Sequence, residues 1–280
     1  MNPLTVGGVP EAYNDPFPLA NFASHGISVP PRFFPYAGGS GSMIKAVVGG
    51  EIDAAFALTD CIVAAIENGT PVRIAGPLIH SPLTWAVIVH PDRQGAVQDL
   101  SEATWGISRM NSGSHVMVST LAKERNWTKE PSFKVCGNFA GLRSALKEGS
   151  IDAFLWEHYT TKPYADKRDV KIIGGVPTPW GCFSVVVRED SKRVDEVHRM
   201  VDAFVEAGKA FVTSESNAKG IMERYGMAEH DAKAWMSGVT YAGVGERSVN
   251  KDMLEKTRRT LLEAGVIKEF KYAGTESYKA

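Results

Sequence analysis

Two stretches of the chain repeat one pattern of apolar and polar positions. Residues 42–56 have apolar side chains at helical spacing, then a glycine, then a continuous apolar run, and residues 141–155 repeat this order. Both contain Gly-x-Ile-Asp-Ala, at 50–54 and at 149–153. Glycine commonly follows the last turn of a helix because it adopts left-handed backbone angles without strain. The repeat predicts two α/β lobes of similar construction, with a ligand-binding cleft between them.

Polar and aromatic residues follow the predicted strand in each copy. Thr59 and Asp60 follow the first strand, and Trp156 and Glu157 close the second. In open parallel sheets ligands bind beyond the carboxyl ends of the strands, which favours a functional meaning for the repeat. The alternative is that Gly-x-Ile-Asp-Ala is only efficient helix–turn–strand chemistry. In either case Asp53 and Asp152 are expected to brace the turn before each strand.

The remaining pattern predicts a discontinuous first lobe, residues 1–89 plus 182–280, and a second lobe, residues 90–181. The chain is expected to cross between the lobes near 88–92 and 177–182, and two crossings of this kind usually form a hinge. Expected strands of the first lobe are 4–9, 52–57, 72–75, 84–89 and 183–188, and those of the second lobe are 104–108, 133–136 and 171–174. Expected helices include one from Asp15 to His25 and a C-terminal set at 194–213, 215–225, 229–237 and 250–264.

A loop rich in glycine and serine leads into a helix in each predicted lobe. The first contains Ser40 and the second contains Asn111, Ser112 and Ser114. Helix N-termini present unpaired N–H groups and the positive end of the helix dipole, which suits a carboxylate, sulfonate or phosphate. Arg109 adds a positive charge near the second loop. Ordinary helix capping explains the same residues without any ligand.

Acidic and aromatic side chains form the second candidate group. Glu157 follows an apolar strand, where an unpaired carboxylate is costly, and Glu11 and Asp60 also follow predicted strands. Trp156 belongs either to the cleft or to the core. A pair of these carboxylates has the groups for acid/base chemistry, but no nucleophile motif accompanies it. An anion at the loops and carboxylates opposite would suit a zwitterion or an amino-substituted heterocycle with an acidic arm.

Composition narrows the range of partners. The 280 residues carry 31 basic and 32 acidic side chains, a net charge of −1, which provides no field to attract nucleic acid. No segment approaches the ~20 apolar residues that span a bilayer, so we expect no membrane insertion. The three scattered cysteines lack metal-ligand spacing and favour reduced thiols, so we expect no metal site. The first residues show no export signal. This pattern indicates either a cytoplasmic protein, which we expect, or a mature form whose signal has been replaced.

Several motifs occur together in an order that resembles a known superfamily. They are Leu-Thr-Val-Gly at 4–7, the run Gly-Ser-Gly-Ser-Met-Ile-Lys-Ala-Val-Val-Gly-Gly-Glu-Ile-Asp-Ala-Ala-Phe at 39–56, Asp-Leu at 99–100, and Arg-Met-Asn-Ser-Gly-Ser-His at 109–115. This combination resembles the type 2 periplasmic-binding-protein-like superfamily, which includes sulfonate-, taurine- and nitrate-binding proteins and the related thiamine-pyrimidine synthases. The nearest likeness is to a signal-less fungal subgroup of the Candida type, over at least residues 4–188.

The resemblance implies a Venus-flytrap protein that closes a cleft on a small organic ligand, anionic or zwitterionic, without a cofactor. By position, the ligand-binding residues would be Glu11, Ser40, Thr59, Asp60, Asn111, Ser112, Ser114, Trp156 and Glu157. The alternative is an enzyme on the same fold, acting on pyrimidine or thiamine precursors or in related cofactor metabolism, with Glu157 and His115 or His158 as the acid/base candidates. The clustered cysteines of the thiamine-pyrimidine synthases are missing here. The lack of a visible export signal also speaks against an importer as partner.

Overall fold

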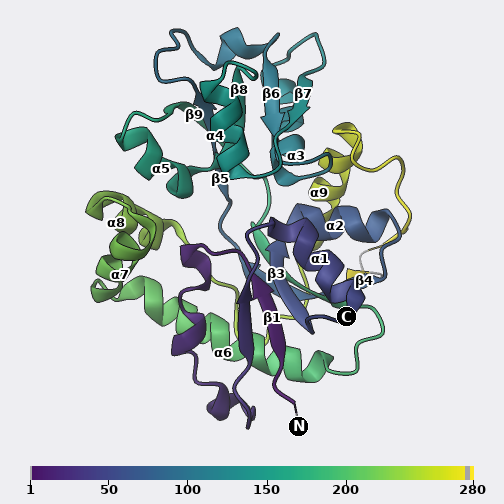
Figure 1. Ribbon diagram of the computed structural model, residues 1–280. Coiled ribbons are helices and arrows are strands. Elements are labelled where there is room, and N and C mark those ends of the chain that lie inside the picture. The colour runs from purple at the N-terminus through teal and green to yellow at the C-terminus, as the bar shows by residue number, and fades with distance from the viewer. Residues whose placement is uncertain (1, 275–277) are drawn as a thin grey trace.

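The computed structural model describes residues 2–274 and 278–280 and contains two five-stranded sheets, one in each lobe (Figure 1). Lobe 1 has the strand order β2-β1-β3-β10-β4 and lobe 2 the order β7-β6-β8-β5-β9. In each sheet the first three strands are parallel and the fourth is antiparallel to them. The expected two-lobed α/β fold is confirmed.

The strands of lobe 1 are β1 (Thr5–Gly8), β2 (Arg32–Pro35), β3 (Ala54–Leu58), β4 (Val72–Ile79) and β10 (Phe183–Arg188), and its helices α1 (Gly39–Gly49) and α2 (Thr59–Glu67) flank β3. The strands of lobe 2 are β5 (Thr84–Val89), β6 (Thr104–Ile107), β7 (Ser132–Val135), β8 (Ala153–Glu157) and β9 (Lys171–Pro177), with α3 (Gly113–Glu124), α4 (Phe139–Lys147) and α5 (His158–Asp166).

The two repeats make the same contacts in their respective lobes. The backbone N–H of Thr5 donates to Oδ2 of Asp53 at 2.8 Å, and the N–H of Thr104 donates to Oδ2 of Asp152 at 2.8 Å. In each case the aspartate ties the residue before β3 or β8 to the start of the neighbouring parallel strand. Both carboxylates therefore brace the turn, as expected from the sequence.

An isoleucine in each repeat packs directly on a glycine of the neighbouring strand. A Cβ atom added at Gly7 would lie 2.8 Å from Cδ1 of Ile52, and one added at Gly106 would lie 2.4 Å from Cδ1 of Ile151. Both distances are shorter than van der Waals contact. Glycine at these positions lets the helix–strand turn approach the sheet, which explains why Ile recurs after each glycine stop.

The first crossing between the lobes differs from the expectation. The sequence pattern predicts strand β5, residues 84–89, in the first lobe, but it lies between β8 and β9 in the sheet of lobe 2. The chain therefore crosses at 80–83, and residues 90–92 belong to lobe 2. A uniformly apolar run predicts a buried strand, but it does not indicate which sheet the strand joins. The pattern therefore could not place β5 in lobe 2. The return crossing lies at 178–182, between β9 and β10.

The expected helix from Asp15 to His25 is wrong. The segment forms three short 3-10 turns, η1 (Ala12–Asn14), η2 (Phe17–Leu19) and η3 (Phe22–His25). Pro18 lies in the middle of the segment, where it would remove a backbone donor and clash with the preceding turn of an α-helix. Gly26 does end the last turn, with φ 73°.

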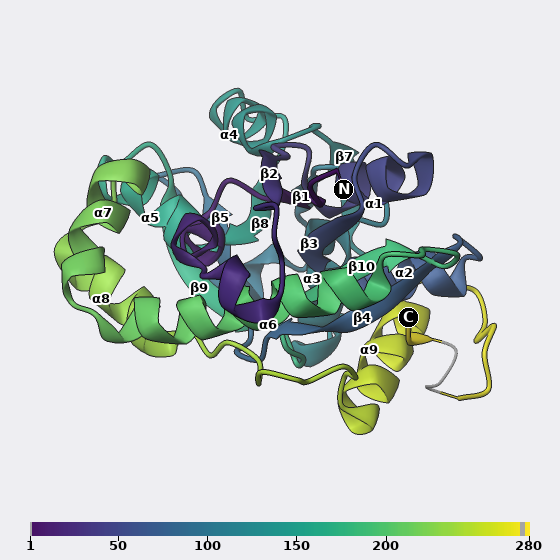
Figure 2. The same ribbon diagram turned by 90° about the horizontal axis from the view of Figure 1, so that it is seen from below.

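The C-terminal helices follow the pattern closely: α6 (Val194–Thr213), α7 (Ser216–Tyr225), α8 (Glu229–Gly238) and α9 (Lys251–Glu263). Asn250 caps α9 by accepting a hydrogen bond from Met253 N. In Figure 2, α6 extends along lobe 1, and α7 and α8 continue from its end. They lie beside α5 of lobe 2 (Figure 1), where Lys162 Nζ is 3.6 Å from Oδ2 of Asp231 on α8.

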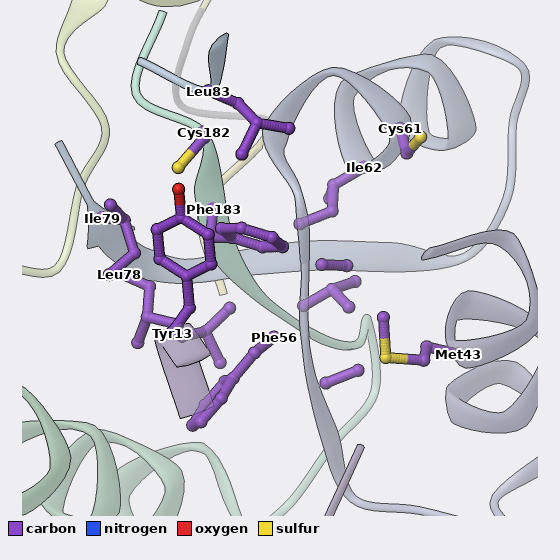
Figure 3. Close-up of a cluster of buried hydrophobic side chains, with 14 of the residues drawn as sticks. Tyr13, Met43, Phe56, Cys61, Ile62, Leu78, Ile79, Leu83, Cys182 and Phe183 are labelled. Carbon is purple, nitrogen blue, oxygen red and sulfur yellow. The ribbon is translucent and has the colours of Figure 1, made fainter. Parts of the chain in front are cut away.

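Aromatic and aliphatic side chains fill the core of lobe 1 beneath the facing ends of the lobes. Tyr13 packs against Phe183, with ring centroids 5.2 Å apart, and its hydroxyl points toward Cys182 (Figure 3). Leu83 of the first crossing lies in the same cluster. The crossings are therefore anchored in the core. Among the described helices, none combines the length and apolar character needed to cross a membrane.

Replacing Gly106 by alanine tests the close packing of the repeat. We expect Gly106→Ala to lower the free energy of unfolding by about 1–3 kcal/mol, because the new Cβ overlaps Ile151 and Leu142. Urea unfolding measures the change. Gly220→Ala, on α7 where an added Cβ meets no atom within 4 Å, serves as control and should be neutral or stabilising. Equal stability of Gly106→Ala and wild type would contradict the packing argument.

Candidate functional site

A cavity of about 270 Å³ lies between the lobes, at the carboxyl ends of β1, β3, β6 and β8. Both lobes contribute to its wall. Most lining residues lie at or just after strand ends or in the first turns of helices: Val9, Pro10, Glu11, Tyr36, Ala37, Gly38, Gly39, Ser40, Leu58, Ser108, Arg109, Gly113, Ser114, Gly137, Asn138, Phe139, Trp156, Glu157 and Thr160. Of the residues predicted to bind ligand, five lie in this wall: Glu11, Ser40, Ser114, Trp156 and Glu157.

One end of the cavity is electropositive. Gly38 precedes α1 and provides no side-chain cap. The N–H of Gly39 donates to the carbonyl of Tyr36 at 3.1 Å, and the start of the helix lines the cavity at Gly39 and Ser40. Arg109 reaches from lobe 2 to this turn, where Nη1 donates to the carbonyl of Gly38 at 3.4 Å. Its guanidinium covers Gly41 so closely that an added Cβ would lie 2.6 Å from Nη2. Among the described residues that line the cavity, Arg109 is the one cation.

Two carboxyl groups from opposite lobes lie at another part of the wall. Glu11 follows β1 and Glu157 ends β8, where its Oε2 accepts the N–H of Thr160 at 2.6 Å. Burial raises the pKa of Glu11 to about 8, and the charge of Glu157 adds to the effect. Burial also raises the pKa of Glu157, against the lowering influence of the N–H groups of Thr160 and Tyr159. We call Glu11 and Glu157 the carboxyl pair.

Aromatic rings form the wall between these polar ends. Trp156 is half-buried and stacks on Phe139 with centroids 5.2 Å apart and planes 23° apart. Trp85 meets Trp156 edge to face at 6.5 Å, and its buried indole N–H has no hydrogen-bond partner among the described residues. Trp156 thus lies in the cavity wall and also packs on a second cluster of lobe 2. Such a surface suits a flat or apolar ligand body.

Thr59 and Asp60 lie beneath the cavity and outside its lining. The Thr59 hydroxyl donates to Gly181 O at 2.7 Å and lies 2.9 Å from the Ser184 hydroxyl, so it joins β3 to the return crossing. Asp60 is 2% exposed in the first turn of α2. Burial raises its pKa to about 6, opposed by its own helix N–H groups, Trp180 and Arg109. Strand-end position predicted cavity access, but both side chains turn inward.

The residues of the loop before α3 have different roles: one caps the helix, one lines the cavity and one lies outside both. Ser112 is the N-cap of α3 and its hydroxyl lies 2.9 Å from that of Ser114, which also accepts the N–H of Ser108 at 3.1 Å. Ser114 lines the cavity, while Ser112 does not. Asn111 is exposed, with φ 61°, and faces an outer groove beyond Arg109. The capping interpretation therefore describes Ser112.

The histidines considered as acid/base partners of Glu157 lie away from the cavity wall. His115 packs edge to face on Phe133 at 4.7 Å, and its Nδ1 accepts the N–H of Asn111 at 3.3 Å. His158 lines an open outer depression. The geometry thus gives Glu157 no histidine partner in the lining. In the described part of the chain, no group of His, Cys, Asp or Glu side chains is arranged to hold a metal ion.

Several wall residues were not singled out from the sequence. Tyr36, Leu83, Phe183, Asn138, Phe139 and Thr160 all line the cavity. Asn138 is the N-cap of α4, at the position in its lobe that corresponds to the Gly38 turn before α1. The repeat could have identified Asn138, because it lies just ahead of the second copy as Gly38 lies ahead of the first. Leu83 and Phe183 are apolar, so the sequence pattern does not distinguish them from residues of the hydrophobic core.

The raised pKa of Glu11 makes stability depend on pH. The folded protein keeps the proton up to about pH 8, whereas an unfolded chain loses it near the ordinary value of 4.5. Stability therefore falls as pH rises from about 5 to 8. We expect Glu11→Gln, which has no proton to lose, to melt at least ~2 °C above wild type at pH 8 and to show no such advantage near pH 4. Glu130→Gln, at an exposed position, should follow wild type throughout. Parallel melting curves of wild type and Glu11→Gln across this range would show that Glu11 ionises normally.

Comparison with known proteins supports the fold. A family model described as Ca3427-like PBP matches residues 85–176. No protein with a curated description matches the chain. The structure is similar to the Candida albicans CA3427 gene product, described as defining a new family with the generic periplasmic binding protein fold: identity is 28%, coverage is 96% of this chain and 92% of that chain, and the TM-score is 0.87.

Two more distant structures share the fold alone. They are the alkanesulfonate-binding protein SsuA from Xanthomonas axonopodis pv. citri bound to MOPS, with 12% identity, coverage of 95% and 94%, and a TM-score of 0.75, and PhnD1 from Prochlorococcus marinus in complex with methylphosphonate, with 11% identity, coverage of 94% and 98%, and a TM-score of 0.60. The resemblance indicated by the sequence motifs is confirmed: the chain has the periplasmic-binding-protein fold and is similar over nearly its whole length to the Candida albicans CA3427 gene product.

Proposed function

We propose that this protein binds a small organic anion or zwitterion in the cavity between its lobes and closes on it. The observation that carries the proposal is the joint placement of Arg109 and the start of α1, which has no side-chain cap, in one wall of the cavity between the lobes. Both favour negative charge, because the guanidinium is a fixed cation and the helix start is the positive end of the α1 dipole. A carboxylate, sulfonate or phosphonate fits this end.

The rest of the wall restricts the ligand body. Its volume of about 270 Å³ suits a metabolite-sized molecule rather than a peptide. Phe139 and Trp156 present stacked rings, which favours an aliphatic or flat ring system. The same fold holds MOPS, itself a sulfonate, in one protein and methylphosphonate in another, which supports an anionic head group here.

Contacts across the cleft support closure as part of binding. Arg109 of lobe 2 bonds to Gly38 of lobe 1, and Lys162 approaches Asp231. The two crossings are hydrogen-bonded side by side: Thr178 N donates to Leu83 O at 2.9 Å and Cys182 N donates to Ser81 O at 3.1 Å. Paired linkers of this kind permit rotation about one axis while keeping the lobes in register.

Replacing Arg109 tests the anionic end directly. Isothermal titration calorimetry with alkanesulfonates, alkylphosphonates and carboxylates of matched chain length should identify binders, and native mass spectrometry of freshly purified protein should reveal any retained molecule. We expect Arg109→Gln to weaken the best anionic binder by about tenfold or more, since a charge-assisted hydrogen bond contributes ~1.5–3 kcal/mol. Arg125→Gln, at the exposed end of α3, is the matched control and should bind as wild type. Unchanged affinity in Arg109→Gln would exclude Arg109 as the anion contact.

Closure is tested by small-angle X-ray scattering. We expect the radius of gyration of the ligand-free protein to fall when a saturating ligand is added, because the open form separates the lobes. The variant Gly41→Leu is informative, since its side chain would displace the Arg109 guanidinium from the α1 turn and hold the lobes apart. A radius that is the same with and without ligand in the wild type would remove the flytrap mechanism while leaving binding itself intact.

A further inference from the structure

A second cavity of about 230 Å³ adjoins the ligand cavity at the carboxyl pair. The two cavities share Pro10, Glu11, Glu157 and Thr160 as lining residues. The outer groove beyond Arg109 adjoins the ligand cavity at Gly38, Ser108, Arg109 and Gly137 instead, so the cation and the carboxyl pair lie at different ends. We call the second cavity the side cavity. It lies between the start of lobe 1, α5 and the α7–α8 region.

Aromatic rings dominate the side cavity. Tyr13, Tyr164, Tyr225 and Trp235 all line it. Tyr13 and Trp235 meet edge to face with centroids 5.2 Å apart. Tyr164 already receives a cation, because the guanidinium carbon of Arg143 lies 3.9 Å from its ring centroid. Several aromatic rings around one space attract organic cations through their negative faces.

Neither member of the carboxyl pair has a cationic partner in the described part of the chain. No Lys, Arg or His nitrogen there is within 4.0 Å of the carboxyl oxygens of Glu11 or Glu157. Arg224 lines the side cavity, but it forms an ion pair with Asp15, which also accepts a hydrogen bond from the Tyr225 hydroxyl at 2.6 Å. Its charge is therefore balanced locally.

We infer that the carboxyl pair and the aromatic side cavity form a subsite for an organic ammonium group. The subsite rests on the proposed function in one respect: the ammonium group belongs to the molecule whose anionic group lies at Arg109, so the ligand class is an ω-amino anion. Glu11 and Glu157 supply the counter-charge from opposite lobes, and the rings of Tyr164 and Trp235 surround the alkyl groups next to the nitrogen. A cation between the two carboxyl groups also links the lobes, so this group favours closure.

The proton on Glu11 provides a signature of this contact. Its pKa of about 8 keeps the carboxyl mostly protonated at pH 7, and an ammonium group favours the ionised form. Binding should therefore release up to one proton at pH 7 and none above about pH 9. The other titratable or charged groups at the site are Glu157, Tyr13, Tyr164, Tyr225 and Cys182, the Asp15–Arg224 pair, and Arg143, whose guanidinium lies over the Tyr164 ring. Burial holds the pKa of Tyr13 and Cys182 well above the usual range, so both stay protonated at pH 7.

Three kinds of probe separate the subsite from the anion site. They are n-alkanesulfonates, ω-aminoalkanesulfonates of the same chain lengths, and n-alkylammonium chlorides. Calorimetry at pH 7 in buffers of different ionisation enthalpy measures affinity and proton release together. We expect the best aminosulfonate to bind about tenfold or more tightly than its matched alkanesulfonate. It should release a proton, whereas the alkanesulfonate releases none. The alkylammonium probe alone should bind weakly and still release a proton.

Variants assign the effect to the subsite. Glu11→Gln should abolish the proton release and the preference for the amino group, so that an aminosulfonate and its matched alkanesulfonate bind this variant with equal affinity. Tyr164→Leu should reduce the preference, and the conservative Tyr164→Phe, which keeps the ring, should restore it. Glu223→Gln, on the exposed side of α7 beside Arg224, removes one negative charge outside the subsite and should behave as wild type.

The outcomes distinguish the two proposals. If both sulfonates bind equally without proton release, or if the preference persists in Glu11→Gln and Tyr164→Leu, the ammonium subsite is overturned and the anion site stands. If the sulfonates fail to bind but the alkylammonium probe releases a proton that Glu11→Gln does not, the subsite stands and the proposed anionic ligand is wrong. If the alkylammonium probe does not bind and the aminosulfonates show no advantage over the alkanesulfonates in the wild type, the subsite is overturned. Preferential binding of the amino group without proton release would show instead that Glu11 is already ionised at pH 7.

Discussion

The close approach of an isoleucine to a glycine on the neighbouring strand is the constraint on which both lobes depend. Ile52 lies on Gly7 and Ile151 on Gly106, at distances that leave no room for a Cβ. The carboxylates of Asp53 and Asp152 then accept backbone hydrogen bonds from the first residues of β1 and β6. These contacts hold each helix–turn–strand unit against its parallel neighbour. As a result the carboxyl ends of the parallel strands lie at one edge of each sheet, and the two edges face each other.

That facing arrangement explains why polar groups collect between the lobes. Five described helices begin at this edge, α1 to α5, and each brings N–H groups that the helix itself cannot pair. Ser112, Asn138 and Glu157 cap α3, α4 and α5, and the buried Asp60 carboxyl meets N–H groups at the start of α2, while α1 begins at a glycine without a side-chain cap. An external anion is therefore stabilised most at the start of α1, where no side chain caps the helix and the Arg109 guanidinium lies against Gly41.

Burial gives the two ends of the cavity different chemistry. Arg109 retains contact with an outer groove, so its charge is partly solvated. Burial disfavours the ionised forms of both Glu11 and Glu157, and the charge of Glu157 further raises the pKa of Glu11. A protein with no ligand stabilises this pair most simply by keeping a proton on it. In the proposed complex a bound cation would replace that proton, and the same two side chains would couple ligand charge to lobe closure.

The local pattern of the sequence determined the elements and their repetition, because amphipathic spacing, glycine stops and caps act over a few residues. It predicted both ends of α6, the Asn250 cap and the two bracing aspartates. It also named as ligand-binding residues five that lie in the cavity wall: Glu11, Ser40, Ser114, Trp156 and Glu157. Only the tertiary structure decided that β5 joins lobe 2, that Thr59 and Asp60 turn inward, and that Arg109 crosses to Gly38. Each of these depends on contacts between residues far apart in the chain. The local sequence of an apolar strand or of a strand-end carboxylate does not depend on which residues will pack against it. Its environment is therefore set only when the two lobes are packed together.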